Sequence, residues 1–157
     1  MPSSSQSAKL KATLLQFQTQ IEKEVDVDDQ KQLQRWVEAV REAFDELHTI
    51  VDEQRQSLHT KLYDEIGDQD ESQRTQIHEF QEADAHIDQL IEIVKSQLIV
   101  LTMQASSEID ARIENQGSDD DEPVLQVVDR GIELIHWIRD QEEAVASWFA
   151  EAFAEGV

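Results

Sequence analysis

Residues 33–58 read LQRWVEAVREAFDELHTIVDEQRQSL, and residues 77–105 read IHEFQEADAHIDQLIEIVKSQLIVLTMQA. In both stretches, mainly apolar residues recur at alternating steps of three and four, which turns one narrow stripe of a helix toward a partner. A polar segment that contains Gly67 separates them and suits a tight connection. Together they predict an antiparallel helical hairpin. Its two seams consist of Leu33, Val37, Val40, Phe44, Leu47, Val51, Gln54 and Leu58, and of Ile77, Phe80, Asp84, Ile87, Ile91, Val94, Leu98, Leu101 and Ala105.

The rest of the composition also favours a few long helices. The chain has 157 residues, enough for one domain with its own core, but only four glycines and two prolines. It has no cysteine, which excludes disulfides and thiolate metal sites. We therefore predict an all-α fold, an antiparallel helical bundle with a long central hairpin and two shorter flanking helices. The expected organisation is a disordered tail over 1–7 and one domain over 8–157, with helices at about 8–24, 28–66, 72–115 and 123–154.

The helix lengths predict an uneven bundle. Short connections make successive helices antiparallel, so both flanking helices should lie beside the same end of the hairpin. That end is expected to be four helices thick. The end near Gly67 should thin to two helices and leave Leu62, Tyr63 and Ile66 poorly covered. These three are candidate interaction residues, and the thin tip is a reason to expect self-association.

The chain is strongly acidic, with a formal net charge of −22 at pH 7. This charge argues against direct binding to nucleic acid or to an anionic membrane surface. The acidic surface is either a solvated face, a docking site for a basic protein, or an imitation of nucleic acid. No apolar run is long enough to span a bilayer, and no signal-like stretch follows Met1, so we expect a cytoplasmic protein.

Two polar residues, Gln54 and Asp84, occupy seam positions and fall at one level when the hairpin is folded about its turn. A buried carboxylate is costly unless it is hydrogen-bonded, and a facing amide supplies a donor. One interpretation is a polar pair that fixes the register of the hairpin. The other is that this level lies near the end of the fourth helix and is hydrated. On a simple desolvation account, Asp84→Leu should raise thermal stability.

Acidic helical bundles include ferritin-like di-iron proteins, whose sites need inward-facing Glu-x-x-His pairs. Glu133 and His136 have that spacing, but the heptad pattern turns both outward. His59 and His78 fall at one level of the hairpin, with Glu82 one turn from His78, so a surface zinc site remains as a metal hypothesis. A pair of solvated histidines is the ordinary interpretation, and we expect no metal and no cofactor.

Trp137 lies off the seam of the C-terminal helix and is hard to bury within the bundle. A partly exposed tryptophan is a common interface anchor, so Trp137 is a candidate interaction residue, although packing against the first helix is the simpler expectation. No phosphate-binding loop or nucleophile motif occurs. We predict a non-catalytic protein that acts as a protein–protein interaction or structural module and self-associates. The alternatives are a ferritin-like metal protein and an acidic inhibitor that mimics nucleic acid.

Overall fold

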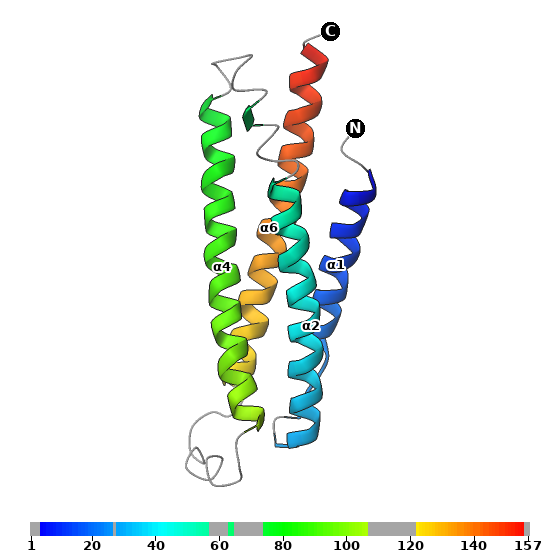
Figure 1. The fold of residues 1–157 in the computed structure, drawn as a ribbon, viewed down its shortest axis with the longest axis vertical. Helices are drawn as coiled ribbons and strands as arrows, with labels where there is room; N and C mark the ends of the chain where they lie inside the picture. The colour runs from blue at the N-terminus through cyan, green and yellow to red at the C-terminus, as the bar shows by residue number, and fades with distance from the viewer. Residues whose placement is uncertain (1–3, 27, 57–62, 65–73, 107–121, 156–157) are drawn as a thin grey trace.

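The computed structural model describes residues 4–26, 28–56, 63–64, 74–106 and 122–155, and four long helices account for most of them (Figure 1). These helices are α1 (Ser4–Glu22), α2 (Gln30–Gln54), α4 (Arg74–Ser106) and α6 (Glu122–Glu155). No strand occurs among the described residues. The predicted all-α fold is confirmed.

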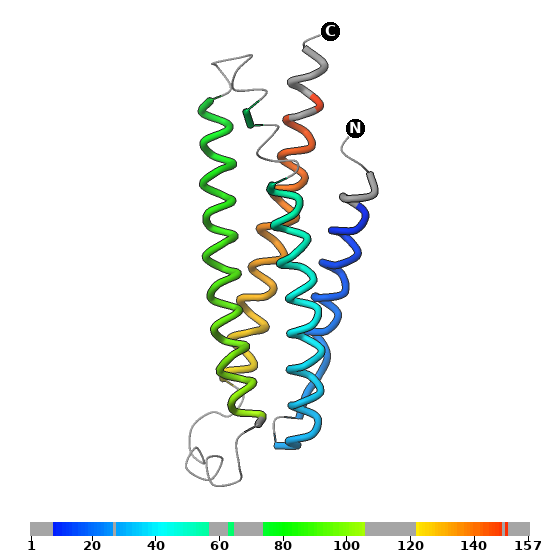
Figure 2. Tube along the Cα trace, viewed as in Figure 1, coloured from blue at the N-terminus to red at the C-terminus, as the bar shows by residue number. Residues whose placement is uncertain are grey.

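The helices form an up-down-up-down bundle, in which consecutive helices are antiparallel (Figure 2). α1 packs on α2 and on α6, and α4 packs on the same two helices from the other side. Every helix therefore has two neighbours, and the apolar stripes close on a central core. In the part of the chain that the structure describes, no helix combines the length and the apolar composition needed to cross a membrane.

Local sequence signals set where two of the helices begin. The side chain of Asp29 caps α2, because its carboxylate accepts hydrogen bonds from the main-chain nitrogens of Lys31 and Gln32, at 3.1 and 3.3 Å. α6 begins with Glu122 and Pro123. The acid suits the positive end of the helix dipole, and the fixed φ of proline suits the first turn.

The predicted seams form the core. Every seam residue that the structure describes in α2 and α4 is buried, including the polar Gln54 and Asp84. Leu58 lies outside the described residues. α1 closes the core from the other side, where the ring of Phe17 lies 6.0 Å from that of Phe44, measured between centroids. The apolar residues that α1 buries are Leu10, Leu14, Phe17 and Ile21.

α6 approaches α1 closely at Gly131, which is buried. A Cβ atom at this position would lie 3.0 Å from Cδ1 of Ile21 and 3.3 Å from Cζ of Phe17. Both distances are shorter than an ordinary van der Waals contact between carbon atoms. The missing side chain therefore sets how near the first and last helices lie.

The first two helices have different limits from those predicted. α1 begins at Ser4, so residues 4–7 are helical rather than a disordered tail. α2 ends at Gln54, and the next turn, at Arg55 and Gln56, has π-type geometry.

The remaining predicted helix limits are only partly covered. Tyr63 and Asp64 are helical, but the rest of the predicted second helix beyond residue 56 lies outside the described residues. The same holds for the predicted third helix after Ser106 and for the turn at Gly67. The fourth helix matches its predicted range to within a residue at each end.

The end of the bundle where α4 begins differs from the predicted two-helix tip. Over the described residues α6 has 34 residues and α4 has 33, and α6 runs beside α4 to this end (Figure 1). There Val145 and Trp148 of α6 pack with Tyr63, Ile77 and Phe80 in a second apolar cluster. Among the described residues, the side chains at this end are therefore covered within the chain, by the helix that we expected to stop short of them.

Candidate functional site

A layer of polar side chains crosses the bundle between its two apolar clusters. Along α4, Asp84 separates Phe80 of the smaller cluster from Ile87 of the larger one. Gln141 lies at the same level on α6, and Gln54 is the last residue of α2. All three polar side chains are buried. We call Gln54, Asp84 and Gln141 the polar layer.

The Asp84 carboxylate accepts a hydrogen bond on each oxygen. The side-chain amide of Gln141 donates to Oδ1, and the hydroxyl of Tyr63 donates to Oδ2 at 3.2 Å. The same Gln141 nitrogen donates to the main-chain oxygen of Phe80 at 3.1 Å. A buried carboxylate loses its hydration, and these donors offset that loss.

Arg55 supplies a positive charge beside Asp84. Its Nη2 donates to the main-chain oxygen of Asp84 at 3.3 Å, and its Nε lies 3.7 Å from Oδ1 of the same residue. Its Nη1 also pairs with the carboxylate of Asp88, one turn further along α4. The guanidinium thus joins the π-type turn after α2 to two carboxylates of α4.

Gln54 makes its contact with a different helix from the one we expected. Its Nε2 donates to Oε2 of Glu142 on α6 at 2.6 Å, whereas the donors to Asp84 are Gln141 and Tyr63. Both members of the predicted pair are buried at one level, but each bonds to α6 rather than to the other. The interpretation that this level is simply hydrated does not fit the burial of Asp84, which is 7% exposed. A role in fixing the register stays a prediction.

Tyr63 connects the polar layer to the smaller apolar cluster. Its ring stacks on Phe80 at 6.2 Å between centroids and lies 6.3 Å from Trp148. Burial, and second the negative charge of Asp84, raises the pKa of the Tyr63 hydroxyl above its ordinary value of about 10. The hydroxyl therefore stays protonated and remains a hydrogen-bond donor.

Sequence reasoning missed the contribution of α6 to the polar layer, although a signal was present. Gln141 lies seven residues after Leu134 and seven before Trp148, and both of these are buried beside the seam. Glu142 lies four residues after Ile138, at a seam position. Heptad spacing alone places both side chains toward the core, whatever their polarity.

Trp137 lies on the outer face between α4 and α6. Its indole is 38% exposed and rests on the ring of His86 of α4, with 4.1 Å between centroids. The expected packing against the first helix is therefore wrong, because the indole contacts α4. Of the three interaction candidates predicted at the tip, Tyr63 is buried. Leu62 and Ile66 lie outside the described residues.

The candidate metal ligands are not gathered into a site in the part of the chain described. His78 pairs with Glu82 at 3.1 Å, and both side chains are well exposed. His59, the third candidate ligand, lies outside the described residues. Glu133 pairs with Arg130 at 2.8 Å on the surface of α6. Among the described residues, no three His, Cys, Asp or Glu side chains converge closely enough to hold a metal ion.

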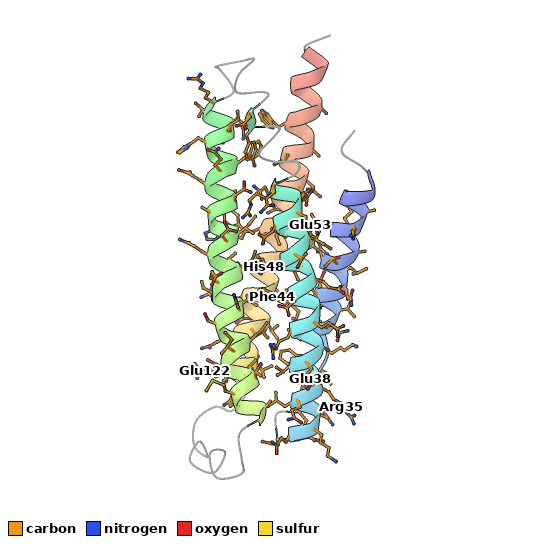
Figure 3. All side chains as sticks on the ribbon, viewed as in Figure 1. Arg35, Glu38, Phe44, His48, Glu53 and Glu122 are labelled. Atoms are coloured by element: carbon orange, nitrogen blue, oxygen red, sulfur yellow. The ribbon has the colours of Figure 1, made fainter. Side chains whose placement is uncertain are left out.

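An open groove of about 430 Å³ lies between α1 and α2. Thr13 and Thr49 line it, but each hydroxyl donates to a main-chain oxygen of its own helix, at 2.8 and 2.9 Å. Glu53 lies on the same part of α2 (Figure 3). The remaining lining residues are Lys9, Asp45, Glu46 and Ile50. The groove is open and its lining is mixed, and its threonine hydroxyls are already engaged.

Comparisons of the chain with protein-family models, with curated protein sequences and with solved structures found no match.

Proposed function

We propose that this protein is a non-catalytic helical bundle that acts as a protein–protein interaction or structural module. The buried ionisable groups support this proposal, because Asp84 is engaged by Gln141, Tyr63 and Arg55 inside the bundle. A carboxylate held in this way is suited to positioning helices and poorly suited to exchanging protons with a substrate.

The observation that carries the proposal is the exposed indole of Trp137. It rests on His86 across the junction of two helices, which limits its rotation, and it still has 38% of its surface in contact with solvent. A large aromatic side chain held in place before binding loses little conformational entropy when a partner covers it. Such side chains are enriched among the residues that contribute most to binding.

The side of the bundle is a better place for an interaction than its tip. The sequence suggested self-association because Leu62, Tyr63 and Ile66 would be poorly covered at a two-helix tip. Val145 and Trp148 pack with Tyr63 within one chain, so this side chain gives less reason to expect a second copy there. Self-association remains part of the proposal only as one form that the interaction could take.

Site-directed photocrosslinking tests the proposal. A photoreactive phenylalanine analogue is placed at Gln89 on α4 or at Gln16 on α1, two exposed glutamines on different helices. We expect a crosslinked protein that, once purified, forms a complex with this chain at a micromolar or lower Kd. Failure to reconstitute a complex with any crosslinked species would contradict the proposal. Stoichiometric iron or zinc in the purified protein would also contradict it and would favour the metal-binding alternative.

A further inference from the structure

The outer face between α4 and α6 carries a row of ring and aliphatic side chains. His86, Ile93 and Val100 follow one another at steps of seven residues, which places them on one side of α4. Ile93 is 41% exposed and Val100 is 54% exposed. Trp137 extends the row onto α6 through its contact with His86. We call these four residues the α4–α6 strip.

The dimensions of the α4–α6 strip suit a helix. His86 and Val100 are two heptads apart, or about 21 Å at 1.5 Å per residue. That length corresponds to about four turns of a partner helix laid along the junction of α4 and α6. The heptad repeat of an amphipathic helix placed there would match the seven-residue spacing of the row.

Acidic side chains border one end of the α4–α6 strip, where His86 and Trp137 meet. On α4, Glu82 is exposed and lies four residues before His86, so the two are neighbours on the helix surface. On α6, Glu133 lies four residues before Trp137, and Asp140 lies three after it. Two basic residues of α6 lie near them, of which Arg130 is paired with Glu133, and Arg139 donates a hydrogen bond to Gln18 of α1 at 2.8 Å. The border at this end is therefore acidic, in a chain whose net charge is −22.

We propose that the α4–α6 strip binds an amphipathic helix of a partner protein whose apolar stripe is flanked by lysine and arginine. This inference rests on the proposed function and adds the face and the chemistry of the partner. A second copy of the chain would bring the same acidic border against itself, and an anionic membrane would be repelled in the same way. A basic amphipathic helix satisfies the apolar row and the acidic border together.

A designed peptide serves as the probe. It is a helix of leucine and lysine about three heptads long, with leucine at the a and d positions, and the matched control contains the same residues in a scrambled order. We expect the amphipathic peptide to shift the emission of Trp137 to shorter wavelength, because the helix would exclude water from the indole. The scrambled peptide should bind more weakly and leave the emission unchanged. The shift should also disappear in Trp137→Phe.

Surface variants locate the binding. Ile93→Gln and Val100→Gln are expected to raise the Kd of the amphipathic peptide about tenfold or more each, because each removes an apolar side chain that binding would bury. Leu15→Gln on α1 is the matched control, since Leu15 is 59% exposed on another helix. It should leave the Kd within about twofold. All three positions are exposed, so the fold is expected to persist, and circular dichroism checks this.

Three outcomes would overturn the assignment. One is equal binding of the amphipathic and scrambled peptides, which would show attraction by charge alone. Another is equal weakening by Leu15→Gln and Ile93→Gln. The third is a dimer of the free protein that Ile93→Gln dissociates, measured by sedimentation. If the crosslinked natural partner still binds the Ile93→Gln and Val100→Gln variants, the proposed function stands and only the α4–α6 strip is rejected.

Discussion

The side-chain amide of Gln141 on α6 donates a hydrogen bond to the buried carboxylate of Asp84 on α4, although 57 residues separate them in the chain. The same amide also reaches the main-chain oxygen of Phe80, one turn away on α4. Sliding α6 along α4 by one residue would move the amide by about 1.5 Å and weaken both bonds. The contact therefore favours one alignment of these two helices.

Asp84→Leu tests what the carboxylate contributes. Because Gln141, Tyr63 and Arg55 all point to it, its removal would leave buried donors without their acceptor. We expect the free energy of unfolding to fall by about 3 kcal/mol, measured by urea denaturation. This is the opposite of the gain expected from desolvation alone.

A double-mutant cycle isolates the link between the helices. Gln141→Leu alone should also destabilise the protein, but Asp84→Leu combined with Gln141→Leu should lose less than the sum of the two single changes, because neither partner is then left unsatisfied. Strict additivity would show that the two side chains act independently, contrary to the hydrogen bond between them.

The stability of the protein should depend on the ionisation of Tyr63 at high pH. The pKa of its hydroxyl is raised in the folded state, so the folded protein holds this proton more tightly than the unfolded chain does. The contribution is complete below the unfolded pKa of about 10 and is lost as the pH rises through and above that value. The free energy of unfolding should decline less steeply above pH 10 in Tyr63→Phe than in the wild type.

The same group can be followed directly, since Tyr63 is the only tyrosine in the chain. Tyrosinate absorbance near 295 nm should stay low in the folded protein at pH values where it has already developed in urea. Tyrosinate formation at the same pH in both states would contradict the burial of this hydroxyl.

Gly131 should accept only a small side chain. In Gly131→Ala, the gain in helix propensity opposes the tight contact with Ile21, and the unfolding free energy should change by less than about 1 kcal/mol. Gly131→Leu must displace Phe17 or the whole of α1, so a loss of about 2 kcal/mol or more is expected. Ala12→Leu, at an exposed position of α1, is the control for added bulk. Equal melting temperatures for Gly131→Leu and the wild type would rule out the close approach of the two helices.

Asp29→Ala should cost about 1 kcal/mol of unfolding free energy, because the main-chain nitrogens of Lys31 and Gln32 lose their acceptor. Asp28→Ala removes the same charge one residue earlier and is the matched control. The difference between the two variants in a thermal melt measures the capping bond. Equal melting temperatures for the two variants would mean that water fully replaces the capping hydrogen bonds of Asp29.

The heptad pattern was sufficient to predict which residues of α2 and α4 are buried, because a 3.5-residue repeat of apolar side chains has one low-energy arrangement. It also placed Gln54 and Asp84 at one level. It could not reveal the partners of these two residues, since the pattern was read for apolar residues and Gln141 and Glu142 interrupt it with polar ones. The heptad spacing of Gln141 from Leu134, and of Glu142 from Ile138, would have shown that both side chains face the core.

The wrong prediction that the fourth helix stops short of the tip has a different physical cause. The prediction of a two-helix tip depended on where the fourth helix ends relative to the start of the third. The spacing of apolar residues along one helix does not determine the axial offset between that helix and its neighbour. Contacts such as Trp148 with Phe80, at 5.1 Å between ring centroids, fix that offset only in the folded chain. The orientation of Trp137 toward α4 rather than α1 is a tertiary choice of the same kind.

The position of the polar layer between two separate apolar clusters has a consequence for how the protein opens. Hydrogen bonds across the layer lose strength when water enters, whereas the larger cluster on the far side does not depend on them. Amide protons around Phe80 and Val145 should therefore exchange with deuterium through a partial opening, at a lower free energy than those around Val40 and Val94. A bundle that looks continuous along its axis would then unfold in two steps, with the boundary at Asp84.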